Sequence, residues 1–196
     1  HRDLHGVGRR QRQMCIRDRG GAVYSPALTD WIFMVKNTSY MYITGPDVIK
    51  AVIGEEVSQE DLGGAMAHAS KSGVCHVVTE NDEDCIRKIK ELLSYLPDSC
   101  HSPLPVAVAT DSPDRECPEL NKIIPDRAAR AYNMKNVIKS VADNSELFEL
   151  HAQWAPNIIV ALIRIMGSPV GVIANHPMSF AGVLNVNASD KASRFL

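Results

Sequence analysis

The sequence lacks several features that would assign it to a class of protein at once. It contains no apolar run long enough to cross a lipid bilayer. Its net charge is −2, and its basic residues do not form the cluster that a nucleic-acid surface needs. We therefore expect neither a membrane nor a nucleic acid as a partner.

Cysteine is present but follows no pattern. None of the five cysteines forms a C-x-x-C pair, which favours free thiols over a disulfide framework or a zinc ribbon. His68 and His76 have a spacing that fits no common zinc pattern. The sequence therefore predicts no metal site, and it shows no arrangement of serine, histidine and aspartate for nucleophilic catalysis.

Residues 1–19 differ from the rest of the chain. They are rich in arginine, show almost no apolar periodicity and do not begin with methionine. A basic targeting segment and a translated sequencing adapter are the two interpretations. We favour an artefact, expect native sequence before Gly20 to be missing, and leave this segment out of the fold.

From Gly20 onward the pattern is regular, and 45% of the whole chain is hydrophobic, which is typical of a globular protein. Apolar β-branched and aromatic runs predict strands, and 3.6-residue periodicity with capping residues predicts helices. The expected strands are 31–35, 40–44, 157–165 and 170–174, the last two forming a hairpin. The expected helices are 48–53 (capped by Asp47 and ended by Gly54), 81–96, 134–141, 146–150 and a last one capped by Ser189, with a proline-bearing linker over 97–130.

Long stretches of the sequence resemble one family. They include GGAVYSPALTDWIFMVKNTSYMYITGPDVIKAV, LGGAMAHASKSGVCH, IIPDRAARAYNMKNVI and APNIIVALIRIMGSPVGVIANHPMSFAGVLNVNASDKASRF. The family is the carboxyltransferase β subunit of biotin-dependent acyl-CoA carboxylases, and the resemblance runs from Gly20 to Leu196. It implies an α/β, crotonase-like carboxyltransferase fold, seen from the end of its first domain to the start of its second. The expected parts are a non-family segment (1–19), the C-terminal part of the first domain plus a linker (20–125), and the start of the second domain (126–196).

The resemblance also implies an activity. It is the transfer of a carboxyl group from carboxybiotin to the α-carbon of a short acyl-CoA, such as propionyl-CoA to methylmalonyl-CoA. Two alternatives stay open: the carboxyltransferase subunit of a methylmalonyl-CoA decarboxylase, which runs the transfer in reverse, and a non-catalytic crotonase-like scaffold that binds CoA.

The implied cofactor is biotin, carried on a separate domain or subunit, with a CoA thioester as substrate. The implied partners are a biotin carboxylase or biotin carrier subunit and further copies of the chain in a homo-oligomer. The implied location is the bacterial cytoplasm or the mitochondrial matrix. We expect this segment to be a fragment that is inactive alone.

The implied carboxyl transfer needs hydrogen-bond donors from the backbone. Loss of the α-proton builds negative charge on the thioester oxygen, and preorganised N–H groups at a helix N-terminus stabilise that charge. Glycine allows the close backbone approach that such donors need. By resemblance, Gly20 and Gly21 match the family's oxyanion hole, and Ala22 and Tyr24 belong to the substrate-binding segment behind it. A plain tight turn is the alternative interpretation.

Two further stretches are predicted to bind substrate. The first contains Gly63, Gly64, His68 and Gly73, and the matching stretch of the family lies beside the cleft. The alternative is that His68 only satisfies local carbonyl groups.

The second stretch contains Asn175 and His176, in a region that helps to form the biotin side of the family's cleft. The family usually has glutamine at the position of His176 and aspartate at the position of Asn185, so the chain departs from it at both positions.

Overall fold

The computed structural model describes residues 23–109, 111–127 and 130–196. The chain divides into two compact units, His1–Lys88 and Ile89–Leu196, which we call the N-terminal and the C-terminal unit. The two units are described separately below. The domain boundary predicted after residue 125 stays a prediction.

The described part of the N-terminal unit contains short helices and two parallel strands. Strand β1 pairs with β2 in parallel, with Phe33 opposite Val77 and Val35 opposite Thr79. A parallel pair needs a crossover connection, and the helices between the two strands provide it. The elements are α2 (Tyr24–Ala27), β1 (Phe33–Val35), α3 (Pro46–Ile53), α4 (Gln59–Gly63), α5 (Ala65–Ala67), the π-helix η2 (His68–Ser72), β2 (Val77–Thr79) and the first part of α6 (Asp82–Leu93).

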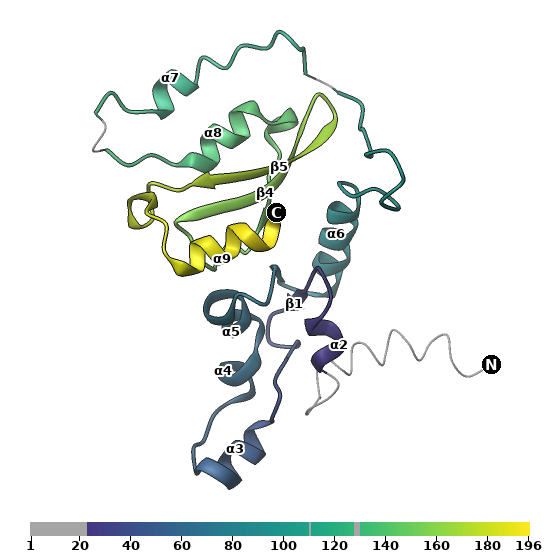
Figure 1. The fold of residues 1–196 in the computed structure, drawn as a ribbon, viewed down its shortest axis with the longest axis vertical. Coiled ribbons are helices and arrows are strands. Elements are labelled where there is room, and N and C mark those ends of the chain that lie inside the picture. Colours follow the sequence, from purple (N-terminus) through teal and green to yellow (C-terminus); the bar gives the residue numbers. More distant parts are fainter. Residues whose placement is uncertain (1–22, 110, 128–129) are drawn as a thin grey trace, which may run out of the picture. The chain divides into compact units, whose positions relative to one another are not determined.

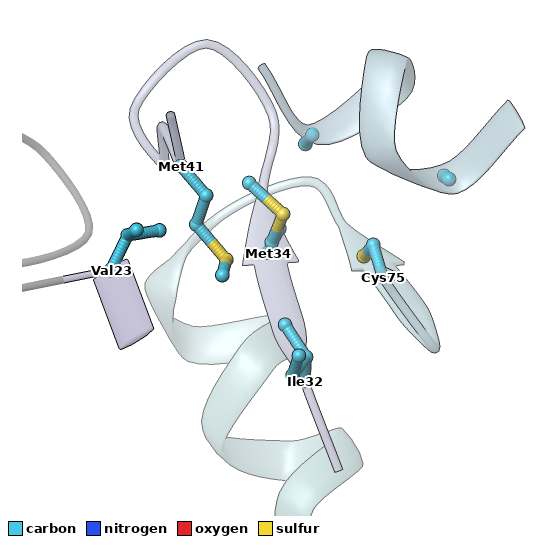
Figure 2. Close-up of a cluster of buried hydrophobic side chains, with 7 residues drawn as sticks. Val23, Ile32, Met34, Met41 and Cys75 are labelled. Carbon is cyan, nitrogen blue, oxygen red and sulfur yellow. The ribbon is translucent and has the colours of Figure 1, made fainter. Parts of the chain in front are cut away.

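A small apolar core holds the N-terminal unit together. In Figure 2 the Met34 and Met41 side chains lie between Val23 and Cys75. Ala65 and Ala69 are fully buried in the same cluster. Flexible methionine side chains fill irregular spaces between elements that approach closely. The core therefore links the residues just after the predicted oxyanion segment to helices α5 and η2.

Two predictions for this unit are wrong in detail. Residues 40–44 do not form a strand: Tyr40 makes an isolated bridge to Gly64. Asp47 does not cap α3, because the helix begins at Pro46 with Gly45 as its N-cap, so Asp47 lies in the first turn. The left-handed Gly54 ends the helix as predicted.

Helix α6 begins as predicted. The Asn81 side chain accepts a hydrogen bond from the Asp84 amide, at 2.8 Å, so it satisfies one of the free donors of the first turn. The helix ends at Leu93, three residues before the predicted end.

The C-terminal unit is built around a three-stranded antiparallel sheet of order β3–β4–β5. Between α6 and α8 the described chain has little regular structure apart from α7, as the proline-rich composition indicates. The elements are α7 (Leu120–Ile123), α8 (Met134–Val141), the 3-10 helix η3 (Asp143–Ser145), β3 (Phe148–Leu150), β4 (Ile158–Ile165), β5 (Ser168–Asn175), the 3-10 helix η4 (Phe180–Gly182) and α9 (Val186–Phe195).

Helices cover both faces of this sheet (Figure 1). On one face, Ile138 of α8 packs on Ile159 and Ile163 of β4. On the other face, Ala188 of α9 packs on Ile158 and Trp154. Because successive side chains of a strand point to opposite faces, β4 is buried on both sides. This explains why its sequence is continuously apolar rather than alternating.

The tip of the predicted β4–β5 hairpin is held by charged side chains. The Asp143 carboxylate accepts hydrogen bonds from the amides of Met166 and Gly167, at 3.0 and 2.6 Å. The Arg164 guanidinium donates to the carbonyl oxygens of Pro105 and Gly167, both at 2.9 Å, and lies over the Tyr95 ring. These contacts tie the segment that follows α6 to the hairpin.

Two further predictions are corrected here. Residues 146–150 were expected to be helical, but Phe148–Leu150 form β3, which pairs with β4. Burial of Phe148 and Leu150 on the sheet outweighs the local helical pattern. The last helix begins at Val186 and is capped by Asn185, not by Ser189.

The cap of α9 gives a testable prediction. Asn185 Oδ1 accepts from the Ala188 amide at 2.9 Å, so Asn185→Ala should cost about 1 kcal/mol of unfolding free energy. Asn185→Asp keeps the cap and places a negative charge at the helix N-terminus, so it should stabilise by about 0.5 kcal/mol. Urea unfolding followed by Trp154 fluorescence measures both.

The matched control is Asn187→Ala, which changes an exposed asparagine inside α9. Since alanine has the higher helix propensity, this variant should be neutral or slightly stabilising. Equal losses at positions 185 and 187 would contradict the capping role.

Candidate functional site

The predicted site residues fall into three groups in the structure. Gly20, Gly21 and Ala22 lie outside the described residues, so the predicted oxyanion hole stays a prediction. Tyr24 and the glycine–histidine stretch 63–73 belong to the N-terminal unit, whereas Asn175 and His176 belong to the C-terminal unit. Tyr24 is exposed at the start of α2.

Gly63 makes a close contact between two backbones. Its carbonyl oxygen accepts from the Met41 amide at 2.8 Å. A Cβ atom at position 63 would lie 2.1 Å from the Met41 carbonyl oxygen, a distance that no side chain can adopt. Glycine is therefore required here because the neighbouring chain passes directly over it.

Gly64 begins the next helical segment. It is the N-cap of α5, and the space beside its Cα is filled by Glu60, whose carboxyl carbon would lie 2.4 Å from an added Cβ. The chain between Tyr40 and Met41 and the chain between Gly63 and Gly64 thus lie against each other. Whether the two glycines also contact substrate stays a prediction.

His68 uses both ring nitrogens within the N-terminal unit. Nε2 lies 2.6 Å from the Met41 carbonyl oxygen, and Nδ1 lies 2.8 Å from the Ser72 hydroxyl. A carbonyl can only accept, so Nε2 carries the proton and Nδ1 accepts from Ser72. His68 therefore holds the carbonyl group of Met41, the same residue that Gly63 contacts.

The helical turn that carries His68 is a π-helix ended by Gly73 at a φ of 65°. Single π-helical turns are rare and occur frequently at functional sites. Gly63 and His68 both contact Met41, and Gly64 and Gly73 begin and end the helical segment between them. Their predicted substrate-binding role is a hypothesis that this packing leaves open.

In the C-terminal unit, Asn175 and His176 lie where β5 ends. The Asn175 side chain donates to the Gly182 carbonyl oxygen at 2.8 Å, and the His176 amide donates to the Asn157 carbonyl oxygen at 2.8 Å. Both residues therefore anchor the segment that follows β5. The His176 Nδ1 atom is buried and has no hydrogen-bond partner among the described residues.

The surroundings of His176 lower the pKa of its imidazole and so favour the neutral form. Burial lowers the pKa of His176, and the nearby Lys135 and Lys191 lower it further, while Glu149 opposes them. Lys135 and Glu149 form an ion pair at 2.7 Å. A neutral imidazole has one donor and one acceptor, as the side-chain amide of glutamine also has.

Sequence reasoning missed two polar residues in the interior of the C-terminal unit. Lys191 and Asn157 are both fully buried. The Lys191 ammonium donates to the carbonyl oxygens of His151, Trp154 and Ile158, at 2.9, 2.9 and 2.8 Å. One signal was available: Lys191 lies on the apolar face of α9, beside Ala188 and Ala192.

The described residues contain neither a membrane-spanning helix nor a metal-binding cluster. Among residues 23–109, 111–127 and 130–196, no helix is long and apolar enough to cross a membrane. In the same ranges, no three histidine, cysteine or acidic side chains converge to hold a metal ion.

The arrangement of β4, β5 and α9, together with solved structures, defines a crotonase-like carboxyltransferase fold. A crystal structure of the transcarboxylase 12S hexamer with hydrolyzed methylmalonyl-coenzyme A bound superposes on this chain with a TM-score of 0.86 at 41% identity, over 90% of this chain and 35% of that one. A single-chain, multi-domain long-chain acyl-CoA carboxylase, at 24% identity and a TM-score of 0.73, shares the fold over 90% of this chain and 17% of that one.

The sequence of residues 14–196 matches the carboxyl transferase domain family. The protein belongs to this family. It is 54% identical to the methylmalonyl-CoA decarboxylase subunit alpha of Veillonella parvula, over 90% of this chain and 35% of that protein. It is 49% identical to the mitochondrial propionyl-CoA carboxylase beta chain of Homo sapiens, over 90% of this chain and 33% of that protein. The chain thus spans about a third of the length of these relatives.

Proposed function

We propose that the protein takes part in carboxyl transfer between biotin and the α-carbon of propionyl-CoA or a similar short acyl-CoA. One observation carries this proposal. The relative at 54% identity is named for methylmalonyl-CoA and the relative at 49% for propionyl-CoA, two thioesters that differ by the one carboxyl group on the α-carbon. Propionyl-CoA and methylmalonyl-CoA are therefore the expected substrate and product, whichever direction the reaction takes.

The direction has two candidates. Carboxylation of propionyl-CoA is the activity that the carboxylase relatives suggest. Decarboxylation of methylmalonyl-CoA is favoured by the identity of 54% to the Veillonella subunit. The partner separates the two: a biotin carboxylase and biotin carrier subunit for the first, and a membrane biotin-decarboxylase subunit for the second. We further propose that the active protein is a homo-oligomer.

The roles of the chain's own residues follow from their chemistry. Carboxybiotin, when bound, supplies the carboxyl group. The predicted amides of Gly20 and Gly21 would stabilise the negative charge on the thioester oxygen when the α-proton leaves. His176 would contact the biotin side through Nε2, since its Nδ1 atom is buried, and would make one hydrogen bond to the ureido group.

The test of the proposal uses the complete reading frame that contains this segment. Incubation with carboxyl-labelled methylmalonyl-CoA and free biotin should move label to biotin, with a rate that depends on biotin concentration. A folded protein that binds the CoA thioester but transfers no label would support the non-catalytic scaffold instead.

His176 gives the second prediction. His176→Ala removes one hydrogen bond to the biotin side and should lower the rate of label transfer about tenfold. His176→Gln retains a donor and an acceptor and should stay within about twofold of the unchanged protein. The same label-transfer assay measures both.

The control for this prediction is His101→Ala, which changes an exposed histidine of the linker. It should leave the rate unchanged. If His176→Ala transfers label at the rate of the unchanged protein, His176 does not contact biotin.

A further inference from the structure

The buried ammonium of Lys191 is the least usual feature of the C-terminal unit. Lysine is almost never fully buried unless it is paired, yet its exposed fraction here is 0%. Its hydrogen-bond partners are backbone carbonyls: three at 2.8–2.9 Å and the Ala155 carbonyl oxygen at 3.4 Å. Four carbonyl oxygens from one short turn thus converge on one cation.

The turn that supplies these carbonyls is strained. His151 and Ala155 have φ values of 51° and 44°, in the left-handed region that side chains disfavour. Such conformations persist only where the surroundings hold them. Carbonyl dipoles that point at one another also repel. The Lys191 ammonium satisfies these dipoles and so fixes the conformation of the turn from 151 to 158.

Asn157 connects this turn to the chain after β5 by hydrogen bonds. Its carbonyl oxygen accepts from the His176 amide at 2.8 Å. Its side-chain nitrogen donates to the Val183 carbonyl oxygen at 2.6 Å. A fully buried asparagine with contacts at both ends of residues 176–183 fixes that segment against the turn.

The segment from 176 to 183 needs this support. Phe180, Ala181 and Gly182 are three consecutive residues with positive φ. The Phe180 side chain and the neighbouring Met178 are exposed, so little apolar packing holds the segment in place. With little packing, hydrogen bonds set its conformation. They are the segment's own backbone turns, the donation from Asn175 to Gly182, and the two contacts of Asn157.

We propose that Lys191 is a positioning residue for segment 176–183, acting through the carbonyl turn and Asn157. The ammonium holds the turn, the turn holds Asn157, and Asn157 holds both ends of the segment. The effect on carboxyl transfer rests on the proposed function above, because the segment contains the predicted biotin-side residue His176. The effect on the conformation of the segment does not.

The conformational test is hydrogen exchange of the 196-residue chain, read by NMR at single amides. Lys191→Met keeps most of the side-chain volume but loses the ammonium. It should make the amides of His176 and of residues 180–183 exchange about tenfold faster, while the centre of β4 stays protected. Lys139→Met, at an exposed lysine of α8, should change nothing.

A rescue experiment separates the ammonium from side-chain packing. Lys191→Ala leaves space for the missing chain, so n-propylammonium should restore protection of residues 176–183 in a saturable way. Tetramethylammonium at equal concentration cannot donate hydrogen bonds and should not rescue. Failure of n-propylammonium to rescue a folded Lys191→Ala protein would overturn the role of the ammonium.

Asn157→Ala tests the link between the turn and the segment directly, and it serves if the Lys191 variants do not fold. It retains the ammonium and the turn but removes the donor to Val183, so residues 180–183 should exchange faster while the turn stays protected. Unchanged exchange at 180–183 would overturn the proposed link.

The activity test uses the complete protein and the label-transfer assay. Lys191→Met should raise the KM for free biotin more than it lowers kcat, because it displaces a binding segment rather than a reacting group. A fall in kcat with an unchanged KM would contradict positioning. If the unchanged protein transfers no label, the proposed function fails, whereas the exchange data still decide the role of Lys191.

Discussion

Gly63→Ala is expected to destabilise the N-terminal unit by about 3 kcal/mol or more. The added Cβ would lie 2.1 Å from the carbonyl oxygen of Met41 and 2.9 Å from its carbonyl carbon. Backbone atoms cannot rotate away as a side chain can, so Met41 must move. That movement breaks the hydrogen bond from its amide to Gly63 and the one from His68 to its carbonyl.

Gly54→Ala is the matched control for this prediction. Gly54 has a φ of 79°, but no heavy atom lies within 4 Å of an added Cβ. The cost is then only that of a left-handed alanine, about 1–2 kcal/mol. The two variants separate a steric conflict with the neighbouring chain from backbone strain.

Hydrogen exchange read by mass spectrometry measures this effect by region. In Gly63→Ala, peptides that contain β1 and β2 should lose protection, while peptides from β4 and β5 serve as the internal reference. A Gly54→Ala protein that loses more protection than Gly63→Ala would show that the contact with Met41 is not what requires glycine at position 63.

The sequence predicts best those features of the fold whose residues are close together along the chain. The hairpin of β4 and β5 was predictable because both strands and their glycine-containing turn are adjacent in the sequence. Residues 40–44 have an equally strong β propensity, but only Tyr40 finds a partner, and that partner is Gly64. A strand needs a neighbouring strand, which propensity alone does not supply.

The contacts of the candidate site residues were not predictable from the sequence. The resemblance singles out Gly63, Gly64 and His68, and their role in binding substrate stays a prediction. The contacts of Gly63 and His68 with Met41 join residues more than twenty positions apart, and no local pattern indicates them. The same limit explains why Asn157 was missed. Lys191 is different, because a lysine on the apolar face of an amphipathic helix is visible in the sequence.

The unfolding free energy of the C-terminal unit should depend on pH through Lys191. Burial lowers the pKa of Lys191 from 10.5 to about 8, while Glu149 raises it and Lys135 lowers it. The elements around Lys191 carry other charged or titratable groups, which are His151 in the turn, His176 after β5, and Asp190 and Arg194 on α9.

The sign follows from proton binding in the two states. Between pH 8 and 10.5 the unfolded chain still binds the Lys191 proton, whereas the folded chain has released it. Stability therefore rises with pH across this window, and this contribution is lost as pH falls through the folded pKa near 8. A shift of this size corresponds to about 3 kcal/mol over the window.

The measurement is the difference in unfolding free energy between the unchanged chain and Lys191→Met, from urea titrations at pH values from 7 to 10.5. The subtraction removes the titration of groups that the two proteins share. The chain has two tryptophans, so a Trp31→Phe background leaves Trp154 as the reporter, in the turn that Lys191 binds. A difference that stays flat above pH 8 would show that the ammonium keeps its proton in the folded chain, because its hydrogen bonds to the carbonyl oxygens then outweigh the cost of burying the charge.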